Sequence, residues 1–453
     1  MKVNNVNGNP LKNNPSLIFI IGFIGVVFIG TTLLNFPFSS LNGRSIGFTD
    51  ALFTATSAVC VTGLTVVTTA TQWTIIGKII ILCLIQIGGL GVMTLSTLIA
   101  FFLGKKISLK TRLLIKEERN TYELQGVVRV TKNVLIYTFI VEFIGAILFS
   151  FVFCKEYGFI KGIWFSIFHS ISSFCNAGFD IVGNTSFMKY VTNPLINFTT
   201  IILIVVGGLG FFVFIEIIKV RKFKKFSLHS KIVLIMTGIL LLSGTILIMV
   251  LEYNNANTIG NLGFFGKLQA SLFQSVATRT AGYSTIDISG LKDSTSVIMC
   301  ILMFIGGSSG STAGGVKVTT IAVAILAMHS TIYGKKHIDI FQKRISNSVI
   351  MKAIAVIGIA FGVVTVVSII LSITQHIPAM SYVDVLFESV SAFGTVGLTR
   401  NVTPYLNFIG KILISGTMFI GRLGPLTIAL AVASRQNRFV GNIGYPEGKI
   451  IIG

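Results

Sequence analysis

A short apolar segment that ends at a glycine occurs four times in this chain, and no other feature limits its folding as strongly. The four glycines are Gly63, Gly178, Gly282 and Gly397, at intervals of 115, 104 and 115 residues. Intervals of this length are several times those of solenoids and propellers. The segments before the glycines are too short to cross a bilayer but long enough for re-entrant helices. Four loops of one polypeptide can therefore meet around a single axis.

The composition indicates that these loops lie within a membrane. The sequence has 453 residues, of which 53% are hydrophobic and 11% charged, and its mean hydropathy is +0.85. Its first apolar run, 17–36, is long enough to cross a hydrocarbon core of roughly 30 Å. We see no cleavable signal pattern before this run and expect it to stay in the mature chain. Non-helical backbone at membrane depth must be buried in protein or face water, so we expect the four loops to line a cavity.

The residues around each glycine indicate what the loops bind. A Thr-Val-Gly sequence after a short helix is typical of a potassium pore, because backbone carbonyls can replace the hydration shell of the ion. Glycine reaches the backbone angles that turn successive carbonyls toward one axis. We therefore expect a K⁺ selectivity filter of backbone carbonyls. Its residues are Val61, Thr62, Gly63, Leu64, Asn176, Ala177, Gly178, Phe179, Thr280, Ala281, Gly282, Tyr283, Thr395, Val396, Gly397 and Leu398.

Each glycine lies between two apolar spans, so the chain divides into four similar units. We expect pore repeats at 17–103, 133–218, 232–328 and 351–433, with cytoplasmic tails at 1–16 and 434–453. The fold class is an all-α polytopic membrane protein with eight spans and four re-entrant loops. Because each unit crosses the membrane an even number of times, all four have the same orientation. A pseudo-fourfold arrangement around one pore follows, unlike the inverted repeats of many secondary transporters.

The basic residues are distributed unevenly between the loops that connect the spans. The formal net charge of +21 could suggest nucleic acid, yet 19 Lys and Arg residues fall in one alternating set of loops (104–132, 219–231 and 335–352) and 8 in the other. The positive-inside rule makes the first set cytoplasmic. We therefore predict a multi-pass protein of the plasma membrane with both termini inside, and no nucleic-acid partner.

The third return segment, 297–328, is too long for one straight span and is interrupted by ten consecutive small residues. These are Gly306, Gly307, Ser308, Ser309, Gly310, Ser311, Thr312, Ala313, Gly314 and Gly315. Such a run cannot form a stable lipid-facing helix, so we expect it to break and expose backbone to the pore. A phosphate-binding loop is excluded, since Gly-Lys-Ser/Thr is missing. For the shorter patches 88–91 and 207–210, helix packing is the stronger interpretation.

Few ionisable residues fall inside the predicted spans. Arg422 should face the cavity, because a charge at the bilayer centre is costly without a partner or water. We expect Asp50 and Asp384 to be helix N-caps. The remaining expectations are that Glu142 and Glu216 lie near helix ends or pair with basic residues, and that His169 and Glu388 pack or hydrogen bond.

Nothing in the sequence points to an enzyme. Neither a catalytic constellation nor a metal cluster is apparent. The five cysteines show no pairing pattern, and we expect buried free thiols.

With the units, filter glycines and downstream glycine patches in place, the chain resembles the Trk/Ktr/HKT superfamily of potassium transporters from residue 17 onward. Trk-type members carry two extra spans before the first unit, so the resemblance is strongest to the membrane subunits of bacterial Ktr systems, KtrB and KtrD. The ending 440–448 fits the same group. The resemblance implies potassium uptake, with the loop 306–315 and Arg422 as a gate. It also implies a homodimer in the lipid membrane on a cytoplasmic ring of RCK subunits, KtrA or KtrC, which carry the nucleotide.

Two departures and one alternative accompany this resemblance. The second loop has Asn176 where a Thr is typical, and Phe273 is one residue closer to its glycine than Phe53, Phe168 and Phe387 are to theirs. Some plant relatives that favour sodium have serine at the first filter glycine, so Gly63 points to potassium; sodium dependence stays open. The alternative is a secondary transporter of another small solute or cation, which a midplane cluster of acidic residues would favour.

Overall fold

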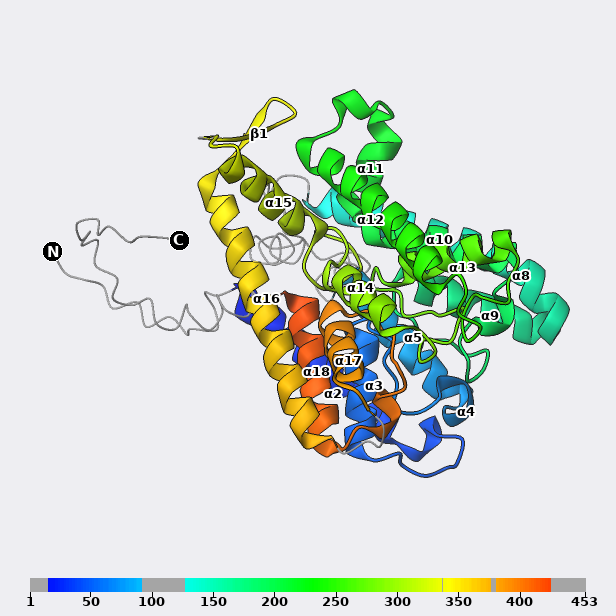
Figure 1. Ribbon diagram of the computed structural model, residues 1–453. Helices are drawn as coiled ribbons and strands as arrows, with labels where there is room; N and C mark the ends of the chain where they lie inside the picture. The colour runs from blue at the N-terminus through cyan, green and yellow to red at the C-terminus, as the bar shows by residue number, and fades with distance from the viewer. Residues whose placement is uncertain (1–14, 92–126, 336, 376–379, 425–453) are drawn as a thin grey trace.

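The computed structural model describes residues 15–91, 127–335, 337–375 and 380–424 (Figure 1). The predicted tails up to residue 14 and from 434, most of the basic segment 104–132, and the span portions 92–103 and 425–433 lie outside these ranges. The regular secondary structure of the described chain is helical except for two short strands. Its long elements are α2 (Pro15–Asn35), α3 (Phe48–Val59), α5 (Ile75–Leu90), α8 (Val127–Tyr157), α9 (Phe159–Phe174), α10 (Pro194–Leu209), α11 (Phe211–Val220), α12 (Leu228–Glu252), α13 (Phe264–Ala277), α14 (Asp293–Phe304), α15 (Val318–Ile332), α16 (Asn347–Thr374), α17 (Tyr382–Gly394) and α18 (Phe408–Leu423).

Four short helices precede the four glycines, and they are packed in a cyclic order. These pore helices are α3, α9, α13 and α17. The return helix of each repeat contacts the pore helix of the next: α5 with α9, α10 with α13, α14 with α17, and α18 with α3. The last contact joins the fourth repeat to the first. The four repeats thus close into a ring, as a pseudo-fourfold arrangement requires.

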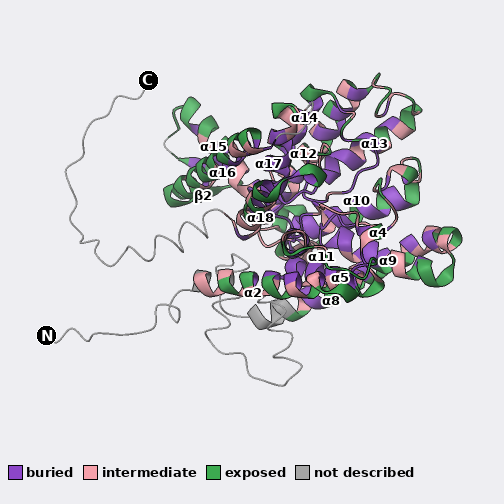
Figure 2. Cartoon of the chain, turned by 90° about the horizontal axis from the view of Figure 1, so that it is seen from below, coloured by how far each residue is buried: buried purple, intermediate pink, exposed green. Residues whose placement is uncertain are grey.

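The distribution of buried and exposed residues agrees with this ring of repeats. Buried residues are concentrated in the middle of the molecule, whereas exposed residues cover α2, α8 and α16 (Figure 2). Many of the exposed residues are large and apolar; examples are Phe28, Phe143, Leu242 and Phe361, one on each of the outer helices α2, α8, α12 and α16. An apolar surface of this kind fits contact with lipid rather than water.

Helix length separates three of the outer helices, α8, α12 and α16, from the other apolar helices. Three described helices are long and apolar enough to cross a membrane, namely Lys132–Tyr157, Leu228–Glu252 and Asn347–Thr374. The helices 20–35, 75–90, 293–304 and 318–332 are apolar but shorter. The presence of eight membrane spans therefore stays a prediction.

The second return segment, expected to be one of the eight spans, is broken. Helices α10 and α11 meet at Gly210 with a bend of 100°. Gly210 has φ 91° and ψ 140°, and Gly91 and Gly424, which follow α5 and α18, have nearly the same angles. Only glycine adopts such angles at little cost. The last glycine of each of these three patches therefore ends its helix, which packing alone does not require.

A small hairpin connects the third and fourth repeats. Strands β1 (Ile338–Ile340) and β2 (Lys343–Ile345) pair antiparallel, with Asp339 opposite Arg344. At the tip of the hairpin, the ring of Phe341 lies 5.2 Å from the ammonium of Lys231. The hairpin and α11 extend from the same end of the molecule, at the top of Figure 1. Two of the predicted basic segments, 219–231 and 335–352, therefore share one face.

The two expected N-caps are wrong by one helical turn. The N-cap of α3 is Gly47, and Asp50 lies in the first turn of this helix. In α17 the N-cap is Ser381, whose side chain accepts from the backbone N–H of Asp384, while the Asp384 carboxylate accepts from the backbone N–H of Ser381. Asp384 therefore belongs to a capping box but at its third helical position. Asp50 has another partner, described below.

Candidate ion pathway

The four filter glycines lie together in a closed ring, which we call the glycine ring. A Cβ added to Gly63, Gly178 or Gly282 would lie within 2.8 Å of a carbonyl oxygen in the following repeat, respectively that of Ala177, Ala281 or Val396. A Cβ on Gly397 would meet the carbonyl oxygen of Thr62, back in the first repeat. The predicted filter residues are thus brought together, with the glycines in cyclic order.

The backbone repeats the same two conformations in every loop. The residue two positions before each glycine is left-handed, although none of the four is a glycine: Val61 (φ 57°), Asn176 (φ 61°), Thr280 (φ 68°) and Thr395 (φ 51°). The glycines themselves have φ between 68° and 93°. Left-handed backbone is uncommon for other residues and unusual for a β-branched one such as Val61. Its fourfold recurrence shows that the loops are structurally equivalent.

The shorter third loop reaches the ring by a tighter turn. In the other repeats a backbone N–H bonds five residues back, from Thr62 to Ser57, Ala177 to Ser172 and Val396 to Ser391. In the third, Ala281 bonds only four residues back, to Ala277. The third loop is therefore one residue shorter between its pore helix and its glycine. Gly282 keeps its place in the ring with φ 72°.

The second and third loops are tied to each other. The hydroxyl of Tyr283 donates to the carbonyl of Phe179 at 2.9 Å, and its ring stacks on Phe187 with centroids 4.7 Å apart. The amide of Asn176 hydrogen bonds with the hydroxyl of Thr280 at 3.2 Å. The amide that replaces the usual Thr thus contributes a contact between repeats.

The small-residue run 306–315, which we call the inserted loop, folds back against the ring. Its two ends are paired, since Gly306 donates to the carbonyl of Val316 at 2.7 Å and Val316 donates to that of Phe304 at 3.2 Å. A Cβ on Gly314 would lie 2.7 Å from Cγ2 of Thr395. The predicted break in the third return segment is present, between α14 and α15. The loop lies directly against the fourth glycine loop.

Backbone groups freed by the break at Gly210 hold the inserted loop. The last carbonyls of a helix have no partner within it, and here Gly208 accepts from the N–H of Ser308 at 3.0 Å and Gly207 from that of Thr312 at 3.3 Å. In return Phe211, the first residue of α11, donates to the carbonyl of Gly310 at 3.1 Å. The bent return segment of the second repeat therefore forms the seat of the inserted loop.

Arg422 joins three repeats. It stands in Gly421-Arg422-Leu423-Gly424 where the first and second repeats have Gly-Gly-Leu-Gly. Its guanidinium donates from Nη1 to the carbonyl of Thr312 in the inserted loop and from Nη2 to the carbonyl of Gly88 on α5. These contacts hold Arg422 against protein backbone, and the expectation that it faces the cavity stays a prediction. Its cation lies among carbonyl oxygens between the loop and the first repeat.

The other patch glycines pack against pore helices. A Cβ on Gly88, Gly207 or Gly421 would collide with the carbonyl oxygen at the end of a pore helix, that of Val59, Phe174 or Phe393 respectively. The packing interpretation of the patches 88–91 and 207–210 is therefore correct for their first glycines. Gly306 differs, because its Cβ would meet the carbonyl of Gly314 inside the inserted loop.

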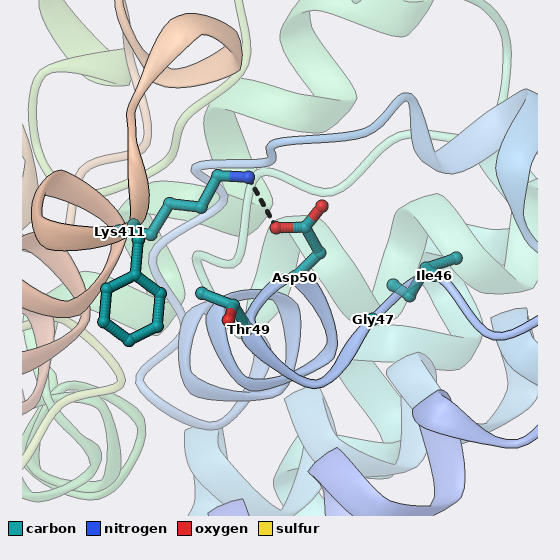
Figure 3. A pocket seen from close by; sticks show the side chains of 6 residues that line it. Ile46, Gly47, Thr49, Asp50 and Lys411 are labelled. Atoms are coloured by element: carbon teal, nitrogen blue, oxygen red, sulfur yellow. Dashed lines mark hydrogen bonds and ion pairs between the residues drawn. The ribbon is translucent and has the colours of Figure 1, made fainter.

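Ion pairs join the repeats at the opposite end from the basic hairpin. Asp50 on α3 pairs with Lys411 on α18, with Oδ1 and Nζ 2.6 Å apart. They line a cavity of about 280 Å³ together with Ile46, Gly47, Thr49 and Phe408 (Figure 3). Arg400, just after the fourth glycine loop, pairs with Asp384 at 2.7 Å and Asp293 at 3.2 Å. These pairs connect the fourth repeat to the first and to the third.

Three other ionisable residues singled out in the sequence, His169, Glu216 and Glu142, have specific partners. His169 lies on α9 with Nδ1 2.7 Å from the carbonyl of Phe165, and its Nε2 accepts from the N–H of Ile181. Glu216, near the end of α11, accepts hydrogen bonds from Ser227 and Ser230. Glu142 is mid-helix and accepts from the amide of Gln86 at 3.0 Å, so its expected place near a helix end is wrong.

The cysteines need a smaller correction. All five are free, and Cys60, Cys175 and Cys300 are buried as expected. Cys154 is half-buried, and Cys83 is exposed on α5, so the expectation of burial is wrong for these two.

Four short helices that bring their glycine loops into one ring, inside a shell of apolar outer helices, define a helical protein of the membrane type. A family model described as TrkH, cation transport protein, matches residues 8–441. The chain belongs to this family, and the predicted superfamily is confirmed.

Similar proteins match this chain over nearly its whole length. The chain is 41% identical over 441 residues to the potassium/sodium uptake protein NtpJ of Enterococcus hirae, covering 97% of each chain. It is 41% identical over 445 residues to the Ktr system potassium uptake protein B of Bacillus subtilis, covering 98% of each. The crystal structure of the potassium transporter TrkH from Vibrio parahaemolyticus matches with a TM-score of 0.74 at 18% identity, over 97% of this chain and 88% of that one. That structure supports the fold.

Proposed function

We propose that this protein takes up potassium through the glycine ring, driven by the membrane potential. The observation that carries the proposal is the closed contact cycle in which each filter glycine lies against a carbonyl of the next repeat. Four loops in this order can surround a dehydrated cation with backbone oxygens. The names of the relatives from Enterococcus hirae and Bacillus subtilis favour potassium, the first also sodium, as the cargo.

The inserted loop and Arg422 form the gate in this proposal. The loop packs against Thr395 of the fourth glycine loop and is held by backbone bonds to α10 and α11. Arg422 adds a fixed positive charge beside it, because a guanidinium does not lose its proton in proteins. A cation that leaves the ring toward the basic face then meets both a steric and an electrostatic barrier.

Regulation is assigned to a cytoplasmic partner. The basic segments 219–231 and 335–352 share one face, which the positive-inside rule makes cytoplasmic. We propose that both termini lie on this side of a bacterial plasma membrane, that two copies of the chain form a homodimer, and that a KtrA- or KtrC-like RCK ring binds this face and carries the nucleotide. Whether potassium uptake depends on sodium is measured in the same experiment as the effect of the cytoplasmic subunit.

The proposal is tested by growth on limiting potassium. A bacterium that lacks its own potassium uptake systems is transformed with this chain, alone or with a KtrA-like subunit, and net potassium uptake is measured with and without sodium. Growth and uptake that require the chain, and that increase with the subunit, are expected. A chain that is present in the membrane yet moves no potassium under any of these conditions would contradict the proposal and favour transport of another solute.

A further inference from the structure

Each pore helix carries a fully buried polar side chain directly after a buried phenylalanine. The phenylalanines are Phe53, Phe168, Phe273 and Phe387, and the residues that follow them are Thr54, His169, Gln274 and Glu388. All four polar side chains are 0% exposed. Because a buried polar group is costly unless it is hydrogen bonded, the partners of these four residues are informative.

Three of the four side chains reach the segment that follows their own glycine. His169 accepts from the backbone N–H of Ile181 at 3.3 Å, and Gln274 donates to the hydroxyl of Ser284 at 3.3 Å. Glu388 accepts from the hydroxyl of Thr399 at 2.7 Å. Thr54 instead donates within its own helix, to the carbonyl of Asp50. The position after the phenylalanine therefore connects the pore helix to the outer end of the loop in the second, third and fourth repeats.

Glu388 has the strongest version of this connection. Its Oε2 accepts from Thr399 and its Oε1 accepts from Thr403, so both oxygens hold the chain beyond Gly397. A carboxylate forms shorter and stronger hydrogen bonds than neutral acceptors do. On the inner side, Gly397 donates its N–H to the hydroxyl of Ser391 at 3.1 Å. The fourth loop is thereby fixed at its glycine and again just beyond it.

We infer that Glu388 is a positioning residue of the filter, which sets how well the fourth loop discriminates between cations by fixing its outer end through Thr399 and Thr403. The inference rests on the proposed function, because discrimination has meaning only if the ring conducts. A displaced outer end moves the carbonyl of Leu398, next to Gly397, and changes the fit to one cation size more than to another.

The test compares two variants that break the connection from opposite sides. Glu388→Gln keeps the shape but removes the charge and one acceptor. Thr399→Val keeps the carboxylate and removes the hydroxyl, which donates to Glu388 and accepts from the backbone N–H of Val402. Thr399→Ser, which restores the hydroxyl, is the rescue variant. The measurements are inhibition of potassium uptake by sodium and the thermal stability of the purified protein.

A matched control is available at Glu252. This carboxylate is also 0% exposed and accepts from two threonine hydroxyls, those of Thr258 and Thr295. These two threonines, and its further partners Asn255 and the N–H of Lys292, lie outside the glycine loops. Glu252→Gln therefore tests what the loss of a buried carboxylate does without a connection to the filter.

We expect Glu388→Gln and Thr399→Val each to reduce discrimination against sodium by roughly two- to tenfold, as for the loss of one hydrogen bond. The double variant should be no worse than the more severe single one, Thr399→Ser should recover, and Glu252→Gln should alter stability alone. Unchanged discrimination in Thr399→Val with a change in Glu388→Gln would mean that charge acts without positioning and would overturn the inference.

Two further outcomes are decisive. If Glu388→Gln only lowers the thermal stability, as Glu252→Gln does, the side chain supports the fold and nothing more. If Glu388→Gln does not fold, Thr399→Val and Thr403→Val still test the connection with the carboxylate in place. Absence of potassium uptake by the unmodified protein would instead contradict the proposed function, and it is seen before any variant is compared.

Discussion

The guanidinium of Arg422 donates a hydrogen bond to the carbonyl of Thr312, 110 residues earlier in the chain. A second bond, to the carbonyl of Gly88, makes the same side chain a bridge from the fourth repeat to the first and the third. Movement of the inserted loop away from Arg422 would leave this cation facing the ion pathway with one carbonyl fewer. In the proposed gate, the same residue therefore supplies the positive charge and holds the inserted loop in place.

Replacement of Arg422 should raise potassium flux. A unit charge about 10 Å away costs a cation roughly 1–2 kcal/mol at an effective dielectric constant of 20, so Arg422→Ala should increase uptake up to roughly tenfold. Arg422→Lys keeps the charge but loses the fork of donors, and it should lie in between. Uptake and thermal stability are measured together. An alanine variant that is both slower and less stable would show that Arg422 only ties helices together.

Deletion of residues 308–313 should also raise flux and reduce dependence on the cytoplasmic subunit. The deletion removes Thr312, the partner of Arg422, while Gly306 and Val316, which pair the ends of the loop, stay in the chain. Uptake with and without the subunit gives the readout. A well-folded deletion protein that conducts less than the parent would contradict the gate.

Serine in place of Gly63 or Gly397 should weaken discrimination of potassium from sodium. Both glycines have a φ above 90°, which costs other residues about 1–2 kcal/mol, and the added Cβ would also meet a carbonyl of the neighbouring repeat. We expect a loss of roughly tenfold in the flux ratio. Gly358→Ser, at a helical glycine with nothing within 4 Å of its Cβ, is the control. If both serine variants kept the selectivity of the parent, Gly63 and Gly397 would not belong to a selectivity filter.

Tyr283→Phe should lower both stability and selectivity. The substitution keeps the stacking on Phe187 but removes the donor to the carbonyl of Phe179, and a buried acceptor without its partner costs about 1–3 kcal/mol. Tyr190→Phe serves as the control, since that buried hydroxyl donates to Glu156 outside the glycine loops. Thermal unfolding and the flux ratio are compared for both. Equal effects on selectivity would mean that the tie between loops has no special role.

The ring could be predicted because its requirements are local. A half-helix, a glycine that must be left-handed and a small-residue run are each visible within about a dozen residues, so the loops at Gly63, Gly178, Gly282 and Gly397 were found without a structure. The break at Gly210 does not follow from the packing interpretation of Gly-Gly-Leu-Gly, although the sequence carries its signal. The last glycine of this patch has a φ of 91° and ends the helix.

Partners of charged residues could not be predicted, because they come from other repeats. Lys411 reaches Asp50 across 361 positions, and Arg422 reaches Gly88 across 334. Glu142 was expected near a helix end, but its partner Gln86 is supplied by the neighbouring repeat at mid-helix depth. Hydropathy locates such residues in a span and says nothing about which span is adjacent.

The backbone groups that hold the inserted loop would have to bind water if the loop moved in the proposed gate. Displacement of the loop separates the N–H groups of Ser308 and Thr312 from the carbonyls of Gly208 and Gly207, and the N–H of Phe211 from that of Gly310. None of these groups can stay unpaired at membrane depth, so water has to take each vacated place. Opening of the proposed gate should therefore take up water molecules, and its equilibrium should depend on water activity: excluded solutes that draw water out of the cavity should favour the seated loop even at a constant potassium gradient.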